Sequence, residues 1–181
     1  MLPCCVEEGE EGVEEEVEEM WSKDKLVAKI IEAAKAQGLE MVEQWAYILA
    51  TVEWETNRTF KPVIEAYWMG DWFRGGLEYY PYYGRGYVQL TWKENYEKFE
   101  RILGLPLVKN PDLALKESVA LRILVEGMKL GKFTGKGLER YINAQKVDYT
   151  NARKVVNGID KARSIKAIAI WWEKKLKEEG R

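Results

Sequence analysis

Histidine is absent from this sequence of 181 residues. Without an imidazole, catalytic triads of the Ser-His-Asp and Cys-His kinds are excluded, and so are most zinc hydrolase sites. Acid–base chemistry must therefore be carried by carboxylates, tyrosines or lysines, and the chain has 30 acidic residues from which to draw.

Cysteine is also scarce. The two cysteines, Cys4 and Cys5, are adjacent and lie in a segment that we expect to be mobile. Neighbouring cysteines of this kind build neither a disulfide framework nor a metal cluster. We therefore expect the fold to be independent of oxidation.

Long apolar runs are missing as well. No stretch approaches the roughly 20 apolar residues that a membrane span requires. The N-terminus has no basic region followed by an apolar run, as a secretory signal would. We therefore expect no membrane insertion, and synthesis in the cytoplasm without a signal peptide.

Charge is distributed unevenly along the chain. Nine of the 30 acidic residues lie between Glu7 and Glu19, whereas all 28 basic residues follow them, so the remainder carries 28 basic against 21 acidic groups, or +7. We predict an acidic, flexible lead-in over residues 1–21 and a single domain over residues 22–181, because this length and 46% hydrophobic residues suit one core. A positive body favours an anionic partner such as a cell-wall polymer or a nucleic acid.

Apolar spacing predicts a mainly α-helical fold. Thr91 and Glu94 form a capping-box pattern at the start of one helix, and Asn110-Pro111 marks the start of another. The segment 57–81 follows neither helical nor strand spacing, and 82–90 alternates like a short strand or hairpin. The expected helices cover about 25–37, 45–56, 91–104, 110–131, 148–157 and 160–178.

Two carboxylates near the end of the second expected helix are candidates for acid–base chemistry. Glu55 ends that helix and Glu65 follows ten residues later, so they could face each other across a groove, as glycoside hydrolysis requires. Glu53 competes with Glu55, since residues two apart on a helix point roughly 200° apart. Periodicity leaves both possibilities open.

A second candidate segment surrounds Arg85. Gly84 and Gly86 flank this arginine and permit close backbone approach to a ligand. On an extended segment Gln89 and Thr91 would point to the same side. The alternative interpretation is a plain hairpin followed by a helix cap.

The chain resembles the family 19 glycoside hydrolases, which comprise plant-type chitinases and bacteriophage endolysin relatives. Residues 83–91, YGRGYVQLT, with Asn95 and Tyr96 resemble the signature G-R-G-x-x-Q-L-[ST]-x4-N-Y. Residues 47–56, YILATVEWET, resemble the helix A-x-x-L-A-x-x-x-H-E-[ST] of that family, although Trp54 replaces the histidine. Residues 110–113 and 156–158 resemble the N-P-D-L and I-N-G elements, and the segment between Glu65 and Gly84 is shorter than in plant chitinases.

The resemblance implies a mainly α, lysozyme-like catalytic domain, with two lobes around a central helix, a substrate cleft and at most a short β-hairpin. It implies that Glu55 is the general acid, that Glu65 is the general base, and that Thr91 holds the attacking water. It further implies that the substrate-binding residues include Gln89, Asn95 and Asn157, to which we add Arg85 and Tyr87 of the same segment.

The expected function is inverting hydrolysis of β-1,4 bonds in peptidoglycan by a monomer. The short loop region, the positive body and the missing export signal favour peptidoglycan, with action on the cell wall after release. The reaction needs no metal and no cofactor, and nucleic acid is not the expected partner. The alternatives are a chitinase acting on N-acetylglucosamine polymers, a non-catalytic glycan-binding protein, and, third, a nucleic-acid-binding module.

Overall fold

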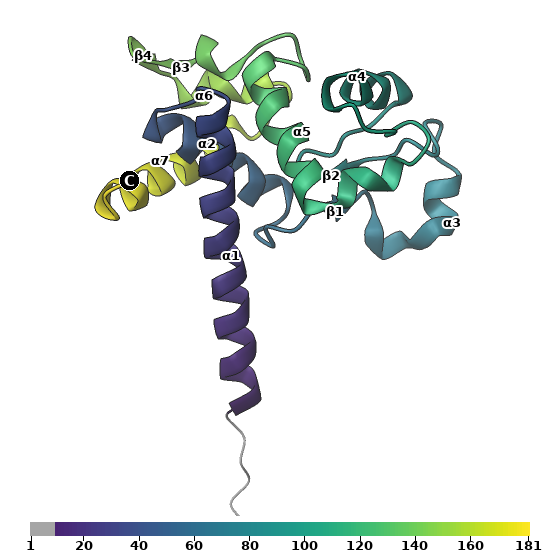
Figure 1. Cartoon of the computed structure of the whole chain (residues 1–181), viewed down its shortest axis with the longest axis horizontal. Coiled ribbons are helices and arrows are strands. Elements are labelled where there is room, and N and C mark those ends of the chain that lie inside the picture. Colours follow the sequence, from purple (N-terminus) through teal and green to yellow (C-terminus); the bar gives the residue numbers. More distant parts are fainter. Residues whose placement is uncertain (1–9) are drawn as a thin grey trace, which may run out of the picture.

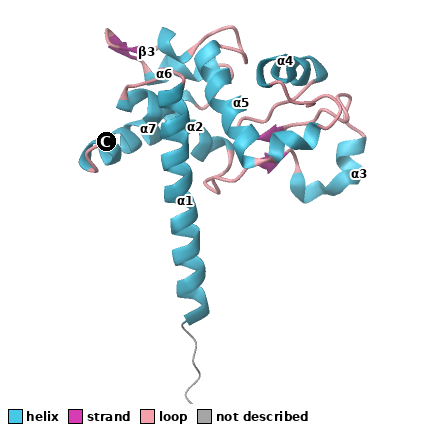
Figure 2. Ribbon diagram, in the orientation of Figure 1, coloured by secondary structure: helices cyan, strands magenta, loops and turns pink. Residues whose placement is uncertain are grey.

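The computed structural model describes the backbone of residues 10–181 and the side chains of residues 23–181. The chain is mainly helical, as predicted, with two short antiparallel hairpins in the described part (Figures 1 and 2). Its α-helices are α1 (Glu10–Ala36), α2 (Val42–Glu55), α3 (Gly70–Gly75), α4 (Lys93–Leu103), α5 (Glu117–Leu130), α6 (Tyr149–Ala152) and α7 (Ala162–Glu178). Its 3-10 turns are η1 (Tyr67–Met69), η2 (Pro111–Leu115), η3 (Leu138–Arg140) and η4 (Arg153–Val155). Its strands are β1 (Val63–Ile64), β2 (Arg85–Gly86), β3 (Ile142–Asn143) and β4 (Lys146–Val147).

Helix α2 forms the centre of the core. Every residue from Gln44 to Val52 is buried, and α2 packs most extensively against α7, whose own buried residues recur three or four positions apart. The one buried amide of this stretch is satisfied, because Gln44 Nε2 donates to the carbonyl of Ile142 at 3.0 Å. The core therefore holds the C-terminal end of α2 in a fixed position.

The elements form two groups on either side of α5 (Figure 1). Helices α2, α6 and α7 and the hairpin β3–β4 lie on one side, whereas α3, α4 and the hairpin β1–β2 lie on the other. The first turns of α1 extend away from this body. Among the described residues, no helix combines the length and the apolar character that a bilayer crossing needs.

Three expected helices have different boundaries, and the one expected over about 148–157 consists of α6 followed by η4. The helix expected from Lys25 begins at Glu10, so α1 includes part of the predicted lead-in, of which residues 1–9 lie outside the described residues. The helix expected from Asn110 to Gly131 is divided, because Lys116 adopts extended backbone between η2 and α5. Pro111 does occupy a first helical position, but it begins a 3-10 turn.

The capping box predicted at Thr91 does not form. Helix α4 begins one residue later than that box requires, with Trp92 at the N-cap and no side-chain cap. The chain turns into α4 through a left-handed Trp92, with φ of 73°. As a result the Thr91 hydroxyl donates to the carbonyl of Gln89, at 2.9 Å.

Candidate active site

A cavity of about 610 Å³ lies at the C-terminal end of α2, within the size range of small-molecule sites. Glu55 and Glu65, the two carboxylates singled out from the sequence, both line it. Its other lining residues are Thr56, Asn57, Thr59, Lys61, Pro62, Val63, Ile64, Ala66, Tyr67, Trp68 and Gln89. The structure therefore brings the two carboxylates to one shared space.

Glu55 is the last residue of α2, and an arginine holds its side chain. Arg153 Nη1 donates to Glu55 Oε1 at 2.7 Å, and its Nε donates to the carbonyl of Asp160 at 3.2 Å. Arg153 is buried, whereas Glu55 keeps some exposure to the cavity. Sequence reasoning missed Arg153, because 98 residues separate the partners and no local motif marks it.

The structure separates Glu53 from Glu55. Glu53 Oε2 accepts a hydrogen bond from Trp172 Nε1 on α7, at 2.8 Å, and Glu53 is not one of the lining residues of the cavity. A rotation of roughly 200° between residues two apart on a helix accounts for this division. The choice that periodicity left open is decided by the packing of α2 on α7.

Glu65 follows β1 directly and is held by three hydrogen bonds. Its N–H donates to the carbonyl of Gly84 at 2.8 Å, which extends the β1–β2 pairing by one residue. Its two carboxyl oxygens accept from the Gly84 N–H and the Tyr79 hydroxyl, each at 2.8 Å. This bond to Glu65 raises the pKa of Tyr79. Hydrogen-bond donors therefore face both carboxyl oxygens of Glu65 and fix the orientation of its side chain.

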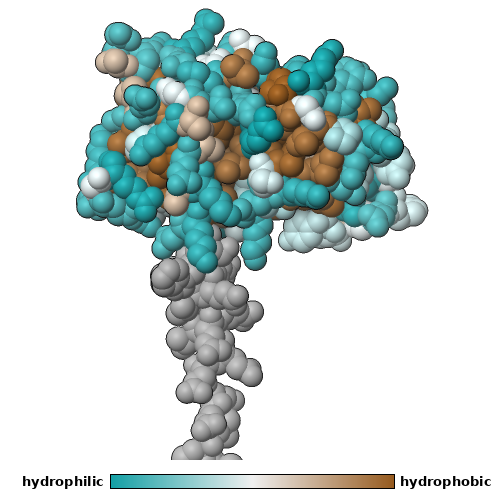
Figure 3. Space-filling model, viewed as in Figure 1, coloured by the Kyte–Doolittle hydropathy of each residue, from teal (hydrophilic) through white to brown (hydrophobic). Residues whose placement is uncertain are grey.

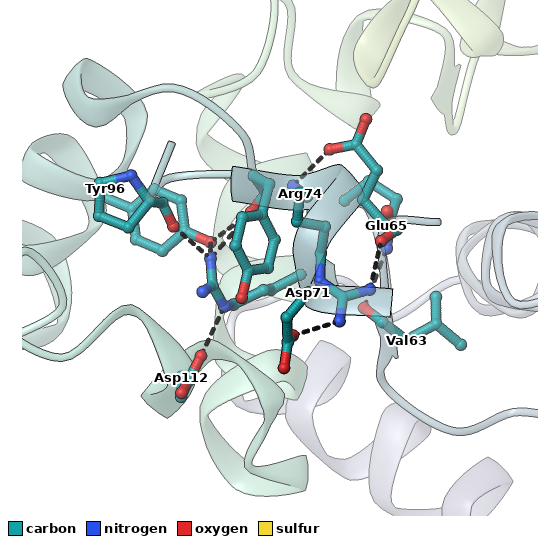
Figure 4. A network of polar contacts seen from close by, with 11 residues as sticks. Val63, Glu65, Asp71, Arg74, Tyr96 and Asp112 are labelled. Atoms are coloured by element: carbon teal, nitrogen blue, oxygen red, sulfur yellow. Dashed lines mark hydrogen bonds and ion pairs between the residues drawn. The ribbon is translucent and has the colours of Figure 1, made fainter. Parts of the chain in front are cut away.

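Arg74 supports the turn that follows Glu65 (Figure 4). This buried arginine of α3 donates through Nη1 to the carbonyl of Ala66, at 3.1 Å, and through Nη2 to Asp71, at 2.5 Å. Ala66 itself is left-handed, with φ of 47°. Arg74 therefore holds an unusual backbone conformation next to a candidate catalytic residue.

The connection between the two carboxylates is rich in left-handed backbone. Asn57, Arg58 and Phe60 have φ values of 49°, 67° and 54°, and none of these residues is glycine. Such conformations are uncommon for residues with a Cβ and persist where the surrounding structure imposes them. The ten-residue path from Glu55 to Glu65 is thus tightly determined.

Gln89 also reaches the cavity, but by a different geometry from the one expected. Its backbone is left-handed, with φ of 51°, so the prediction that Gln89 and Thr91 point the same way on an extended segment is wrong. The Gln89 amide donates to the carbonyl of Val63 at 3.0 Å. A Cβ at Gly84 would lie 2.6 Å from Gln89 Oε1, so Gly84 is needed for the approach of this side chain.

Arg85 and Tyr87 face the interior instead of the cavity. Arg85 is 3% exposed; it pairs with Asp112 at 2.8 Å, donates to the Tyr96 hydroxyl at 3.1 Å, and lies 3.7 Å from the centre of the Tyr83 ring. Tyr87 is buried at 1% exposure. The structure therefore places both residues outside the lining of this cavity, and Arg85 organises the loop that carries Gly84.

The remaining predicted residues lie outside the lining of this cavity. Asn95 Nδ2 donates to the carbonyl of Thr91 at 2.8 Å, which links the start of α4 to the turn at Gln89. Asn157 is exposed, and its Oδ1 accepts from the N–H of Gly158 at 2.8 Å. Of the eight residues predicted for the site, Glu55, Glu65 and Gln89 are brought together.

Comparison with known proteins gives a match at the arginine-containing segment. Residues 71–123 match the model of glycoside hydrolase family 19, described as chitinase class I. This segment is similar to the glycoside hydrolases of family 19. This finding confirms the resemblance predicted from the sequence, and the segment includes Arg85, Gln89 and Thr91.

Several relatives share a short stretch with this chain. An endochitinase of Arabidopsis thaliana is 51% identical over 35 residues, which are 19% of this chain and 12% of the relative. Chitinase 11 of Oryza sativa subsp. japonica is 56% identical over 39 residues, 22% and 15% of the two chains. Inactive chitinase-like protein 1 of Hevea brasiliensis is 50% identical over 38 residues, 21% and 12%.

The stretches shared with these relatives thus span only 12 to 15% of the relatives' own length. Glu55, Glu65 and Asn157 lie outside residues 71–123, so their predicted roles are not covered by the match. The relatives also include a protein named as inactive. The case for catalysis therefore depends on the cavity and its carboxylates.

Proposed function

We propose that this protein is a glycoside hydrolase that cleaves β-1,4 bonds of N-acetylglucosamine polymers, with Glu55 as general acid and Glu65 as general base. The observation that carries the proposal is that both carboxylates line one cavity. The family 19 match at residues 71–123 is a separate line of support for glycoside hydrolysis, because the matched residues include neither Glu55 nor Glu65.

The two carboxylates have different hydrogen-bond partners. Glu65 accepts hydrogen bonds at both oxygens, from Tyr79 and Gly84, which hold its side chain in place for the role of general base in our proposal. Glu55 Oε1 is paired with Arg153, and in our proposal the other carboxyl oxygen carries the proton that is donated to the leaving oxygen of the substrate. In an inverting reaction, the acid protonates the leaving oxygen while the base activates water on the opposite face of the sugar.

The hydroxyl of Thr91 enters this proposal through the resemblance. Its bond to the carbonyl of Gln89 ties it to a residue that lines the cavity, and Asn95 holds the Thr91 carbonyl from the other side. A hydroxyl that already donates one hydrogen bond can still accept one. In our proposal Thr91 accepts a hydrogen bond from the water that Glu65 activates.

Chitin is the first substrate to test. The relatives reported above carry chitinase names, so they favour the chitinase alternative over the peptidoglycan substrate expected from the sequence. The net charge of +7 after residue 20 still gives peptidoglycan, as part of an anionic wall, a place as second candidate. Action on the cell wall after release from the cytoplasm remains a prediction.

The deciding experiment compares three glutamine variants on chitin oligomers. Glu55→Gln and Glu65→Gln should each lose turnover by at least about 100-fold while they still bind the oligomers, because each removes one proton-transfer group. Glu53→Gln is the matched control, because it lies two residues from Glu55 and contacts Trp172 instead of the cavity. It should retain activity.

The stereochemistry provides a second readout. Inversion of a β-linked substrate releases the α-anomer first, which proton NMR of fresh product detects. Loss of turbidity of purified cell walls, without release of chitin oligomers, would identify peptidoglycan as the substrate instead. Binding of oligomers without any turnover by the unsubstituted protein would identify a glycan-binding protein and overturn the proposal.

A further inference from the structure

An exposed aromatic surface follows Glu65 directly. Tyr67, Trp68 and Trp72, on η1 and α3, are 68%, 74% and 90% exposed. Large aromatic side chains are on average well buried, and a group of exposed ones on a monomer marks a binding surface. Figure 3 shows a pale area, the colour of residues of intermediate hydropathy, on the side of the molecule where α3 lies in Figure 1. We call Tyr67, Trp68 and Trp72 the aromatic surface.

This surface is continuous with the candidate active site. Tyr67 and Trp68 line the same cavity as Glu55 and Glu65. Their ring centres are 5.3 Å apart and their planes meet at 85°, so the two rings present faces in different directions. Trp72 lies one turn further along the chain, on α3. A ligand that leaves the cavity past Tyr67 and Trp68 would meet aromatic side chains.

The backbone beneath the aromatic surface is fixed. Arg74, buried in the same helix as Trp72, donates to the carbonyl of Ala66 immediately before Tyr67. The N–H of Met69 donates to that same carbonyl oxygen, at 2.9 Å, and closes η1. A preorganised surface loses less conformational entropy on binding than a mobile loop.

We propose that the aromatic surface binds the glycan polymer from the edge of the cavity outward to Trp72, so that the protein acts better on long or insoluble chains than on short oligomers. This inference rests on the proposed function. A β-1,4-linked sugar chain is flat and extended, and its ring hydrogens form apolar faces that stack on aromatic rings, while its hydroxyls stay in water. Tyr and Trp combine a large apolar face with a polar tip, which suits such a ligand.

The test measures binding to insoluble chitin by sedimentation, in the Glu55→Gln background so that the polymer is not consumed. Trp68→Ala and Trp72→Ala should each weaken binding about three- to tenfold, the effect expected of one stacked aromatic contact. Trp171→Ala is the matched control, since Trp171 is a half-exposed tryptophan of α7 and lies outside the cavity lining. It should bind as tightly as the background protein.

A parallel assay separates this inference from the proposed function. In the active protein, Trp72→Ala should lower the ratio of turnover on insoluble chitin to turnover on chitin hexamer by the same three- to tenfold. Active protein whose Trp68 and Trp72 variants bind and turn over insoluble chitin like the Trp171 control would overturn the inference and leave the hydrolase intact. Tryptophan-dependent polymer binding without turnover would overturn the hydrolase alone.

The same variants also test whether a second copy of the chain, instead of a glycan, occupies the aromatic surface. A second copy of the chain would give a dimer in sedimentation velocity that Trp72→Ala dissociates. Such a dimer, with unchanged binding to insoluble chitin, would overturn the inference. A protein that stays monomeric while the variants lose polymer binding supports it.

Discussion

Replacing Gly84 by alanine tests whether the loop of the family signature positions Glu65. The added Cβ would lie 2.6 Å from Gln89 Oε1 and 3.2 Å from both Cβ and Cδ of Gln89. These distances are shorter than normal van der Waals contact, so the Gln89 side chain must move. The Gly84 N–H donates to Glu65, so a shift of this loop reaches the candidate base as well.

The expected cost comes from two contributions. Displacing Gln89 breaks its hydrogen bond to the carbonyl of Val63, which contributes about 0.5–1.5 kcal/mol. Inserting a methyl group into a filled site costs about 1–3 kcal/mol. Because both contributions have one cause, we expect the free energy of unfolding to fall by about 2 kcal/mol, or the melting temperature by about 4–8 °C for a chain of this size.

Thermal unfolding and initial rates on chitin hexamer measure the two consequences. Turnover should fall about ten- to 100-fold, because a small displacement of a catalytic group is enough for such a loss. Gly75→Ala is the matched control, since nothing lies within 4 Å of its added Cβ and its φ is not left-handed. It should leave both quantities unchanged.

A double-mutant cycle with Gln89→Ala then identifies the cause. Removing the Gln89 amide takes away the closest obstruction, so Gly84→Ala should cost less than half as much in that background. An equal cost in both backgrounds would refute the reasoning, as would a Gly84→Ala protein with the melting temperature and turnover of the unsubstituted one.

Three further predictions concern other parts of the chain. Arg153→Met should destabilise the protein by about 2–3 kcal/mol in urea unfolding and lower turnover, since it leaves Glu55 without its partner; unchanged stability and rate would contradict the role given to this pair. Asp148→Ala should cost about 1 kcal/mol, because Asp148 caps α6 by accepting from the Asn151 N–H at 3.0 Å; equal urea midpoints would contradict it. Burial raises the pKa of Tyr96 to about 12 from 10.0. The contribution of the neutral Tyr96 side chain to the free energy of unfolding is therefore complete below pH 10 and is lost as pH rises toward 12. Urea midpoints that stay constant from pH 8 to 12 would contradict this predicted pH dependence. Burial acts in the same direction on the pKa values of Tyr47, Tyr87 and Tyr149.

The helices were largely predictable from the sequence because their buried faces follow helical spacing. Helix α2 ends at Glu55, within a residue of the expected end, and α7 ends at Glu178 as expected. The start of α4 was not predictable from Thr91 and Glu94, because the left-handed Trp92 turns the chain and diverts the Thr91 hydroxyl to Gln89. A tertiary turn thus overrode a local capping pattern.

The candidate site was predictable in part. The spacing of Glu55 and Glu65 suggested a pair across a groove, and both line the cavity. Arg153 could not be found, since its contact with Glu55 joins segments 98 residues apart. The burial of Arg85 could not be found from the sequence either, since its partner Asp112 lies 27 residues away.

The left-handed residues between Glu55 and Glu65 have a consequence for protein engineering. Glycine adopts such backbone without strain, so glycine at the exposed positions 57 or 58 would loosen the connection without removing any group from the core, to which Phe60 belongs. The separation of the two carboxylates decides whether glycosidases invert or retain configuration. A small library of glycine replacements in this short stretch would therefore sample different separations of the Glu55 and Glu65 carboxylates while the rest of the fold stays the same.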